Sequence, residues 1–443
     1  MSFLAYDLLI LLLLLFIGVP LPYCFAGAVL FLATTNGINL MSLVTWGVSQ
    51  MTSFTLIAGP VFILVGLMLN TTKITDKLLD LASTFTTKVK GGLGVITVVV
   101  CGFLGAISGS SFTGVSACAP ALQPKMVKAG YPAGYSAALL ASSTILGILI
   151  PPSVTMITYG WITGTSVLAC FLSTIVPAIV LMILLSIINI IDFKKFSANA
   201  SPSTDTLSAA AAAAVVVPET KRSRGGVFFS AIPALAMPII ILGGIYGGIF
   251  TPTEAAAVAV SVAVVVGVFC YRTLHPKNFL KTFRDSCSSI GAIMFMIFFC
   301  LLLSQIMVLL KIPESLVAVF MGFTTNKIVI LLFLNVFLLF VGMIVNDSTA
   351  IVLCAPILLP LCQSYGISGV QLGAIMAVNL GFGGLTPPYA SVLYLSMRVC
   401  DVKFEEIMKP TLRFLLCAYF PVSLLTTYIS GFATWLPKLF GFM

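Results

Sequence analysis

Residues 108–131 read SGSSFTGVSACAPALQPKMVKAGY, and residues 345–367 read VNDSTAIVLCAPILLPLCQSYGI. Each is followed by a shorter paired stretch, LGILIPPS at 146–153 and FGGLTPPY at 382–389. The two copies align without a gap, and Pro120, Pro124, Gly130, Gly147, Pro151 and Pro152 match Pro356, Pro360, Gly366, Gly383, Pro387 and Pro388. In a membrane protein, such paired breaks inside apolar sequence indicate a substrate and ion site where two repeats meet.

The composition is that of a membrane protein. Of the 443 residues, 60% are hydrophobic and only 8% are charged, whereas soluble domains are typically about 25% charged. Apolar stretches long enough to cross a bilayer recur along the chain, at 8–19 extended by 23–33, 93–107, 171–191, 227–250, 255–271 and 329–345. The sequence lacks the short alternating segments of an outer-membrane barrel. We therefore predict an all-α polytopic membrane protein.

The net charge of +9 is explained by membrane topology rather than by nucleic-acid binding. Basic loop residues mark the cytoplasmic side of a membrane, and here they are Lys73, Lys77, Lys88, Lys90, Lys125, Lys128, Lys194, Lys195, Lys221, Arg222 and Arg224. No basic region precedes Leu8, so the segment from Leu8 onward is interpreted as a retained first helix and not a signal peptide. The eleven cysteines form no C-x-x-C pair and His275 is the only histidine, so neither a zinc site nor a disulfide framework is expected.

The repeats divide the chain into halves, 1–196 and 225–443. The segment between them, 197–224, is rich in Ala, Ser and Thr and ends in a basic cluster, and we interpret it as a cytoplasmic linker. Each half is predicted to hold scaffold helices, a re-entrant helical hairpin and a broken transmembrane helix. The hairpins are expected at about 93–129 and 327–365, and the broken helices at about 134–165 and 370–398.

Loop charges indicate that the two halves are inverted in the membrane. Lys125 and Lys128 flank the turn of the first copy, whereas stretch 361–371 of the second has neither Lys nor Arg. If positive charge marks the cytoplasm, the copies face opposite sides. Upstream of each copy lies an amphipathic stretch, 71–90 and 275–285, which is typical of a helix in the plane of the interface. An ordinary cytoplasmic loop is the alternative for both.

The first copy predicts a cation site at a hairpin tip. Ser108, Gly109, Ser110 and Ser111 interrupt an apolar run, and irregular backbone at membrane depth is tolerated only where it is buried or lines a cavity. Serine hydroxyls and freed carbonyls are hard oxygen ligands suited to a small cation. Close helix packing by small residues is the alternative. Pro151 and Pro152 then break the next helix and favour an anion at the start of the half-helix that follows, although a simple kink is also compatible.

The second copy places different polar groups on the same skeleton. Asn346 and Asp347 occupy the hairpin tip, deep in apolar sequence, where a carboxylate is costly and usually functional. Asp347 is expected to coordinate a cation or stabilise the tip, and it can also cap the second hairpin arm. Asn379 precedes the glycine-rich second break, in which Thr386 supplies a hydroxyl.

Other polar residues have simpler explanations. Glu254 ends the sequence TPTE, a capping box with Pro at the first helical position. Arg398 follows an apolar stretch and either faces a substrate carboxylate or extends to the interface. No phosphate-binding loop of the G-x-x-x-x-G-K-[ST] type is present, so an ion gradient must supply the energy. An intramembrane enzyme would need paired acids, or His with acids, at membrane depth, and Asp347 is nearly alone there.

Several motifs resemble the large membrane subunit of tripartite ATP-independent periplasmic (TRAP) transporters. The resemblance covers nearly the whole chain outside 197–224. It rests on GPVF (59–62), AISGSS (106–111), GY (130–131), GILIPPS (147–153), GGIYGGIFTPTEA (243–255) and LTPP (385–388). The last two are highly specific together. The chain departs from the usual pattern at Gly381, where the family often has an acid, at Ala390, where it often has Gly, and at 384–386, where GLT replaces a commoner LIT.

The resemblance implies an elevator-type transporter of the ion-transporter superfamily, found in the bacterial inner membrane. It implies sodium-coupled import of a C4-dicarboxylate, sialic acid or another sugar acid. The partners would be a separate small four-helix membrane subunit and a periplasmic substrate-binding protein, with Na⁺ as coupling ion and no other cofactor. A stand-alone secondary anion transporter of the two-hairpin class is the alternative. The sodium residues it implies are Ser108, Ser110, Ser111, Gly147 to Ile150, Asp347, Gly383, Gly384 and Thr386. The substrate is expected at Ser111, Pro152, Ser153, Asn346, Asn379, Pro388 and Arg398.

Overall fold

The described part of the chain is helical throughout. The computed structural model describes residues 9–11, 13–14, 17–74, 77, 91–109, 111–199, 224–388 and 390–443, and no β-strand occurs among them. Seven of the helices in these ranges are long and apolar enough to cross a membrane, and two bent helix pairs raise the number to as many as nine. The prediction of an all-α polytopic membrane protein is confirmed. The proposed linker lies almost entirely outside the described residues, as does most of stretch 71–90.

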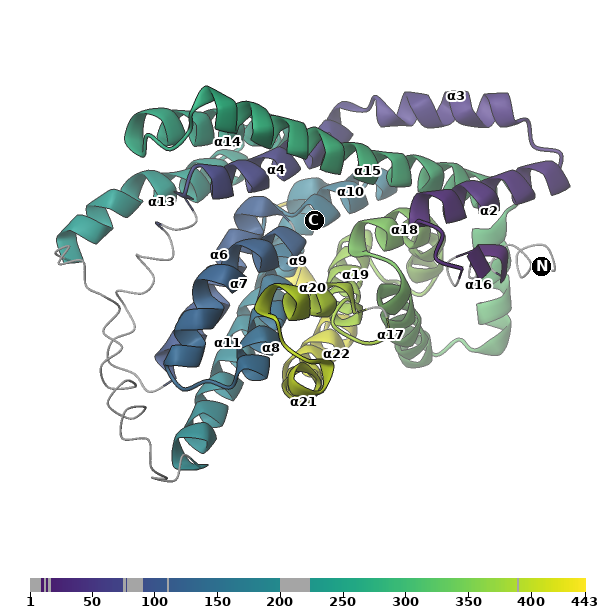
Figure 1. Cartoon of the computed structure of the whole chain (residues 1–443). Helices are drawn as coiled ribbons and strands as arrows, with labels where there is room; N and C mark the ends of the chain where they lie inside the picture. Colours follow the sequence, from purple (N-terminus) through teal and green to yellow (C-terminus); the bar gives the residue numbers. More distant parts are fainter. Residues whose placement is uncertain are drawn as a thin grey trace.

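One group of helices forms a framework along one side of the molecule (Figure 1). The framework helices are α2 (Leu21–Thr35), α3 (Leu40–Met51), α4 (Phe54–Thr71), α13 (Arg224–Tyr246), α14 (Pro252–Val265, continued by the π-helix Val266–Cys270) and α15 (Pro276–Leu309). α14 packs along α4, and Thr253 Oγ1 donates a hydrogen bond to the carbonyl of Phe54 over 3.2 Å. α15 crosses α2, α3 and α4. The framework therefore ties the first half of the chain to the second.

The predicted capping box opens α14. Thr251 Oγ1 accepts the Glu254 amide, and Glu254 Oε2 in return accepts the Thr251 amide over 2.8 Å. Stretch 275–285 forms the start of α15, where Phe279 and Phe283 stack with their centroids 6.3 Å apart. α15 has 34 residues, or about 51 Å at 1.5 Å per residue. It is therefore longer than the roughly 30 Å bilayer core, and this stretch is helical rather than a loop.

The first hairpin consists of α6 (Gly92–Ser108) and α7 (Ser111–Lys128), joined by a tip at Gly109. The following broken helix is made of α8 (Ala133–Thr144), the short α9 (Leu146–Leu149) and α10 (Val154–Thr163). Between α9 and α10 the chain is extended at Ile150, and the Pro151–Pro152 peptide is cis. α11 (Val167–Asn199) returns along this hairpin.

The second half repeats this arrangement. α16 (Ile312–Phe323) leads to a hairpin of α17 (Lys327–Ile344) and α18 (Asp347–Ser364). The next broken helix is α19 (Gly369–Gly383) and α20 (Ser391–Cys400), with a cis Pro387–Pro388 peptide at the break. The chain ends in α21 (Phe404–Phe414, with the π-helix Leu415–Tyr419), α22 (Phe420–Tyr428) and α23 (Ser430–Leu439).

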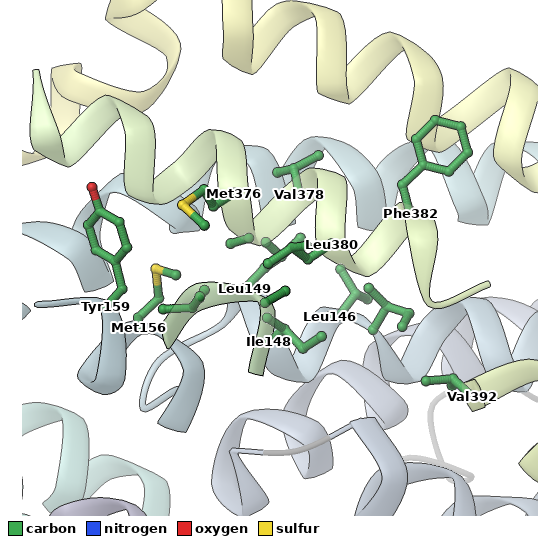
Figure 2. Close-up of a cluster of buried hydrophobic side chains, with 14 of the residues drawn as sticks. Leu146, Ile148, Leu149, Met156, Tyr159, Met376, Val378, Leu380, Phe382 and Val392 are labelled. Carbon is green, nitrogen blue, oxygen red and sulfur yellow. The ribbon is translucent and has the colours of Figure 1, made fainter. Parts of the chain in front are cut away.

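Contacts at the ends of the broken helices establish the inversion. Gly134, in the first turn of α8, packs against the backbone of Glu406 in α21. At the far end of the same span, Tyr159 of α10 donates a 2.5 Å hydrogen bond to the carbonyl of Gly369, where α19 begins. Near the end of α19, a Cβ on Gly381 would lie 2.6 Å from Ile145 Cγ2, between α8 and α9. Because α19 starts beside α10 and ends beside the α8–α9 junction, it runs antiparallel to α8–α10. Figure 2 shows their apolar faces packed together, with Leu146 and Ile148 opposite Leu380.

Both hairpins are closed at their bases by tyrosine. Tyr131 Oη donates to the carbonyl of Gly91 over 3.0 Å and accepts the Gly94 amide. In the second hairpin, Tyr365 Oη donates to the carbonyl of Thr324 over 2.8 Å. Each bond joins the residues just outside the two arms, so the base of each hairpin is fixed by one buried or half-buried phenol.

Ala390 occupies a backbone conformation that suits glycine. Its φ is 34°, in the left-handed region, at the residue that precedes α20. This conformation costs an alanine roughly 1–2 kcal/mol.

We therefore expect Ala390→Gly to stabilise the protein by about 0.5–1 kcal/mol, because the relieved strain exceeds the extra chain entropy of glycine in the unfolded state. The measurement is the melting temperature of the purified protein in detergent. Ala257→Gly, on an exposed face inside α14, is the control and should lower the melting temperature, since glycine weakens a helix interior. A lower melting temperature for Ala390→Gly would contradict the strain argument.

Candidate functional site

The two hairpin tips and both broken helices surround one small cavity. Its volume of about 10 Å³ leaves room for roughly one water-sized particle. The lining residues are Ser111 and Phe112 from the first hairpin, Ile145 and Ile148 from the first broken helix, Gly342, Val345, Asn346 and Asp347 from the second hairpin, and Leu380, Gly384, Ser391 and Val392 from the second broken helix. Both repeats therefore contribute to one site, as the paired sequence breaks indicate.

The first tip is shaped by glycine. Gly109 has φ 63° and separates α6 from α7. A Cβ on Gly109 would lie 2.9 Å from Val154 Cγ2 and 3.2 Å from the Val154 amide nitrogen, so the tip packs directly on the start of α10. Ser111 is buried and lines the cavity. The side chain of Ser108 and the whole of Ser110 lie outside the described residues.

At the second tip, Asn346 rather than Asp347 caps the hairpin arm. Asn346 Oδ1 accepts the amide of Thr349 over 2.9 Å, which is the N-cap bond of α18. Asp347 is the first residue of that helix, where a negative charge is favoured by the helix dipole. The capping role considered for Asp347 in the sequence thus belongs to its neighbour, and the carboxylate is left to bond elsewhere.

The carboxylate of Asp347 bonds across the repeat interface. Thr155 Oγ1 donates a 2.7 Å hydrogen bond to Asp347 Oδ2. Thr155 is buried in the first turn of α10, so the second hairpin tip is tied to the broken helix of the other repeat. Sequence reasoning missed Thr155. Its position just after the Pro-Pro break was the available signal, because a residue in the first turn of a half-helix is close to the break itself.

A framework helix also reaches the second tip. Thr349 Oγ1 donates a 2.9 Å hydrogen bond to Met296 Sδ, and both side chains are buried. Met296 lies in α15, which packs along α18. A thioether is a weak acceptor, so the bond holds the tip against the framework only lightly. Nothing in the local sequence around Met296 predicts this contact.

In the first broken helix, Ile148 lines the cavity, whereas the other residues predicted to bind sodium or substrate do not. Ile150 is extended at the end of α9, and its amide donates to the carbonyl of Leu146 over 2.7 Å. Ser153 caps α10 and is fully buried, its Oγ accepting the Met156 amide over 3.4 Å. Pro152 is buried beside it. Gly147 packs on Gly105 of the hairpin and does not line the cavity.

The second break divides its predicted residues in the same way. Gly384 lines the cavity, while Gly383 packs on Gly342. Thr386 Oγ1 donates to the carbonyl of Phe382 over 2.8 Å, so its proton is used within the helix end and its oxygen lone pairs stay available. Pro388 is exposed. Arg398 is exposed in the last turn of α20 and does not line the cavity, a position that suits extension to the interface.

Asn379 belongs to a separate buried network. Its Nδ2 donates to Asn335 Oδ1 over 2.8 Å, and its Oδ1 accepts from Ser423 Oγ over 2.8 Å. Thr427 Oγ1 also donates to Asn335 Oδ1. These bonds join α19 to α17 and α22 and satisfy polar groups that would be costly if left unpaired. The side chain of Asn379, which the sequence predicts to bind substrate, is therefore engaged between helices and does not line the cavity.

The oxygen chemistry at the cavity suits a small hard cation. Asp347 and Ser111 line the cavity, and the Thr155 hydroxyl is bonded to the Asp347 carboxylate. Such oxygen groups are of the type that coordinate alkali cations at unwound transmembrane helices. Within the described ranges, no three His, Cys, Asp or Glu side chains lie together as a transition-metal site would require. The start of α10 presents backbone N–H groups and favours an anion nearby.

Comparisons with known proteins identify one family over nearly the whole chain. A family profile described as "Tripartite ATP-independent periplasmic transporter, DctM component" matches residues 8–432. The chain is 30% identical over 430 residues to the sialic acid TRAP transporter large permease protein SiaM of Vibrio cholerae, covering 96% of each chain. It is 31% identical over 391 residues to the C4-dicarboxylate TRAP transporter large permease protein DctM of Pseudomonas aeruginosa, covering 88% of this chain and 87% of that one. It is 31% identical over 428 residues to the isethionate TRAP transporter permease protein DctMQ of Oleidesulfovibrio alaskensis, covering 93% of this chain and 65% of that longer one.

Two solved transporter structures share the fold. The YdaH transporter of Alcanivorax borkumensis superposes with a TM-score of 0.63 over 89% of each chain, at 16% identity. MtrF of Neisseria gonorrhoeae superposes with a TM-score of 0.61 over 88% of this chain and 85% of that one, also at 16% identity. The likeness at this level of identity concerns architecture alone.

Proposed function

Because the chain belongs, as a large membrane subunit, to the DctM component family of TRAP transporters, we propose that it imports a small organic anion in symport with sodium. Members of this class are permeases and not enzymes. The proposed location is the bacterial inner membrane. The proposed partners are a small membrane subunit and a periplasmic protein that delivers the substrate.

The observation that carries this proposal is the Asp347 carboxylate at the junction of both repeats. It lies at the second hairpin tip, is bonded to Thr155 of the other repeat and borders a cavity of about 10 Å³, which is room for roughly one small particle. A charged carboxylate at membrane depth is costly, and a bound cation offsets that cost. Each entering sodium ion gains about 2.3 kcal/mol per 100 mV of membrane potential, which supplies the driving force.

The proposed substrate is an anion with a carboxylate or sulfonate group. Relatives are named for sialic acid, C4-dicarboxylates and isethionate, all of which carry such a group. Ser111, Ser153 and Asn346 are polar residues at or beside the cavity, and the N-terminus of α10 favours negative charge. Sodium bound at Asp347 would add to this attraction, which makes anion binding depend on the ion.

Transport is proposed to follow an elevator mechanism. The moving body would comprise the two hairpins and the two broken helices, which are joined through the Asp347–Thr155 bond and through close glycine contacts. The framework helices would stay fixed. At the second tip the polar contacts between them are two weak bonds to Met296 Sδ, from Thr349 Oγ1 over 2.9 Å and from Asn346 Nδ2 over 3.9 Å, and such bonds to a thioether are readily given up during a motion.

Uptake into proteoliposomes tests the proposal. The chain is reconstituted with its small subunit and its binding protein loaded with labelled sialic acid, succinate or isethionate. We expect uptake of one of these only with an inward sodium gradient, and none with a potassium gradient of equal size. Equal uptake under both gradients would rule out sodium coupling. Uptake that persists without the binding protein would favour the stand-alone anion transporter instead.

A further inference from the structure

A second, larger cavity lies at the end of the framework, outside the transport site. Its volume is about 590 Å³, and it is lined by Lys73, Lys77, Phe229, Ser230, Pro233, Cys270, Tyr271 and Thr273. The ends of α4 and α14 and the start of α13 meet there (Figure 1, upper left). The volume falls within the roughly 300–1,000 Å³ of pockets that bind small molecules.

Side-chain hydrogen bonds join the walls of this framework pocket. Tyr271 Oη donates a 2.7 Å hydrogen bond to the carbonyl of Ser230, joining the end of α14 to α13. Thr273 Oγ1 donates a 2.9 Å hydrogen bond to the carbonyl of Thr72, joining the same loop to the end of α4. Three helices are therefore held together around the pocket by side-chain bonds to backbone, and the pocket is a built feature of the framework.

The pocket combines positive charge with an apolar wall. Lys73 and Lys77 supply two ammonium groups, and no ion pair joins either of them to an acidic residue in the described ranges. Stretch 71–90 contains four lysines and two aspartates, so its sequence also leaves net positive charge. Phe229 is 72% exposed and adjoins Pro233 on the opposite wall. An anion with an attached hydrocarbon would satisfy both surfaces.

The position of the pocket corresponds to the headgroup level of a bilayer. α13 and α14 are both long and apolar enough to span a membrane, and the pocket lies at the end of these spans. It is also the end from which the basic linker sequence enters α13. Basic pockets between transmembrane helices on the cytoplasmic side are typical sites for acidic lipid headgroups.

We propose that the framework pocket binds an anionic phospholipid. The phosphate lies between the ammonium groups of Lys73 and Lys77, and the acyl chains leave along Phe229 and Pro233. Such a lipid links α4, α13 and α14 at their common end. It takes no part in the transport site, so it steadies the framework independently of the proposed function.

Native mass spectrometry of the full chain in detergent tests this site with dioctanoyl-phosphatidylglycerol as the probe. We expect the double variant Lys73→Gln and Lys77→Gln to bind the lipid roughly thirtyfold more weakly. Each lysine near an acidic headgroup strengthens binding by a factor of about five, and the two factors multiply. Glutamine removes the charge from a side chain only one atom shorter than lysine, and at Lys73, with φ 58°, it adds no backbone strain that lysine lacks.

The matched control is Lys277→Gln with Lys281→Gln. These lysines are exposed on α15 at the same end of the protein and do not line the pocket. The control should change affinity by less than about twofold, because exposed charges are screened by salt. Equal loss in both double variants would overturn the proposal. So would equally tight binding of dioctanoyl-phosphatidylcholine, or displacement of the lipid by inorganic phosphate at a similar concentration, which would identify a free-phosphate site.

A fluorescence measurement keeps the proposal testable if the double variant folds poorly. Phe229→Trp places an indole in the pocket, whereas the native Trp46, Trp161 and Trp435 do not line it. Phosphatidylglycerol brominated in its acyl chains should quench the added emission at lower lipid fractions than brominated phosphatidylcholine does. Identical quenching curves for the two lipids would show that the site does not select an anionic headgroup.

Discussion

Replacement of Asp347 by Asn is expected to lower sodium-driven uptake by about 100-fold or more. Asparagine keeps the size of the side chain and an oxygen that can accept from Thr155, so the change isolates the negative charge. Loss of one partner from a buried ionic contact costs about 3–5 kcal/mol, which is roughly 10²–10⁴-fold in affinity. The measurement is the sodium concentration that gives half-maximal uptake in proteoliposomes, together with the maximal rate.

Two further variants make this result specific. Thr155→Val removes the 2.7 Å bond to the carboxylate but keeps the branched shape, and a hydrogen bond to a charged group contributes about 1.5–3 kcal/mol. It should raise the half-maximal sodium concentration roughly 10- to 100-fold and leave the substrate preference unchanged. Asp285→Asn, on an exposed turn of α15, is the control and should behave as wild type. Normal sodium dependence in Asp347→Asn would remove this carboxylate from the ion site.

The sequence predicts the skeleton of the site well because the skeleton is local. A Pro-Pro pair cannot continue a helix, and a glycine flanked by serines at membrane depth must be covered by protein. These local rules correctly indicate the tips near Gly109 and Asn346 and the breaks at Pro151 and Pro387. Loop charge also correctly indicates that the halves are inverted, as the antiparallel course of α19 confirms.

The partners of the polar residues could not be predicted in the same way. Thr155 bonds Asp347, and Met296 accepts from Thr349, across long sequence separations and between different helices. Nothing in the local sequence encodes such a pairing. Asn379 illustrates the converse: a polar residue in apolar sequence suggests a ligand site, yet its side chain is engaged by Asn335 and Ser423. Burial alone does not distinguish a ligand-binding amide from one that joins helices.

The other large effect is expected where glycines let the hairpins touch the broken helices. A Cβ on Gly147 would lie 2.5 Å from the Cα of Gly105, and a Cβ on Gly383 would lie 2.6 Å from the Cα of Gly342. The same close contact between a hairpin arm and a broken helix thus occurs in both repeats. Small residues permit this approach of backbones, which replaces the missing hydrophobic driving force between helices in a membrane.

We therefore expect Gly147→Ala and Gly383→Ala each to destabilise the protein by about 3 kcal/mol, the upper part of the usual range for overpacking, because the clash is with backbone that cannot rotate away. The melting temperature in detergent should fall by several degrees, and uptake should be lost because the tip is displaced from the break. Similar losses in the two variants would follow from the repeated geometry.

Gly291→Ala and Gly322→Ala provide the matched controls. Both glycines lie inside helices, in α15 and α16, with no atom within 4 Å of an added Cβ. Alanine there should raise stability by about 0.5–1 kcal/mol, since glycine is the poorer helix former. If Gly147→Ala and Gly383→Ala also raised the melting temperature, the hairpins would not be packed on the broken helices through these glycines. The cavity between the tips would then need another means of support, because its walls are formed by the segments that these contacts hold together.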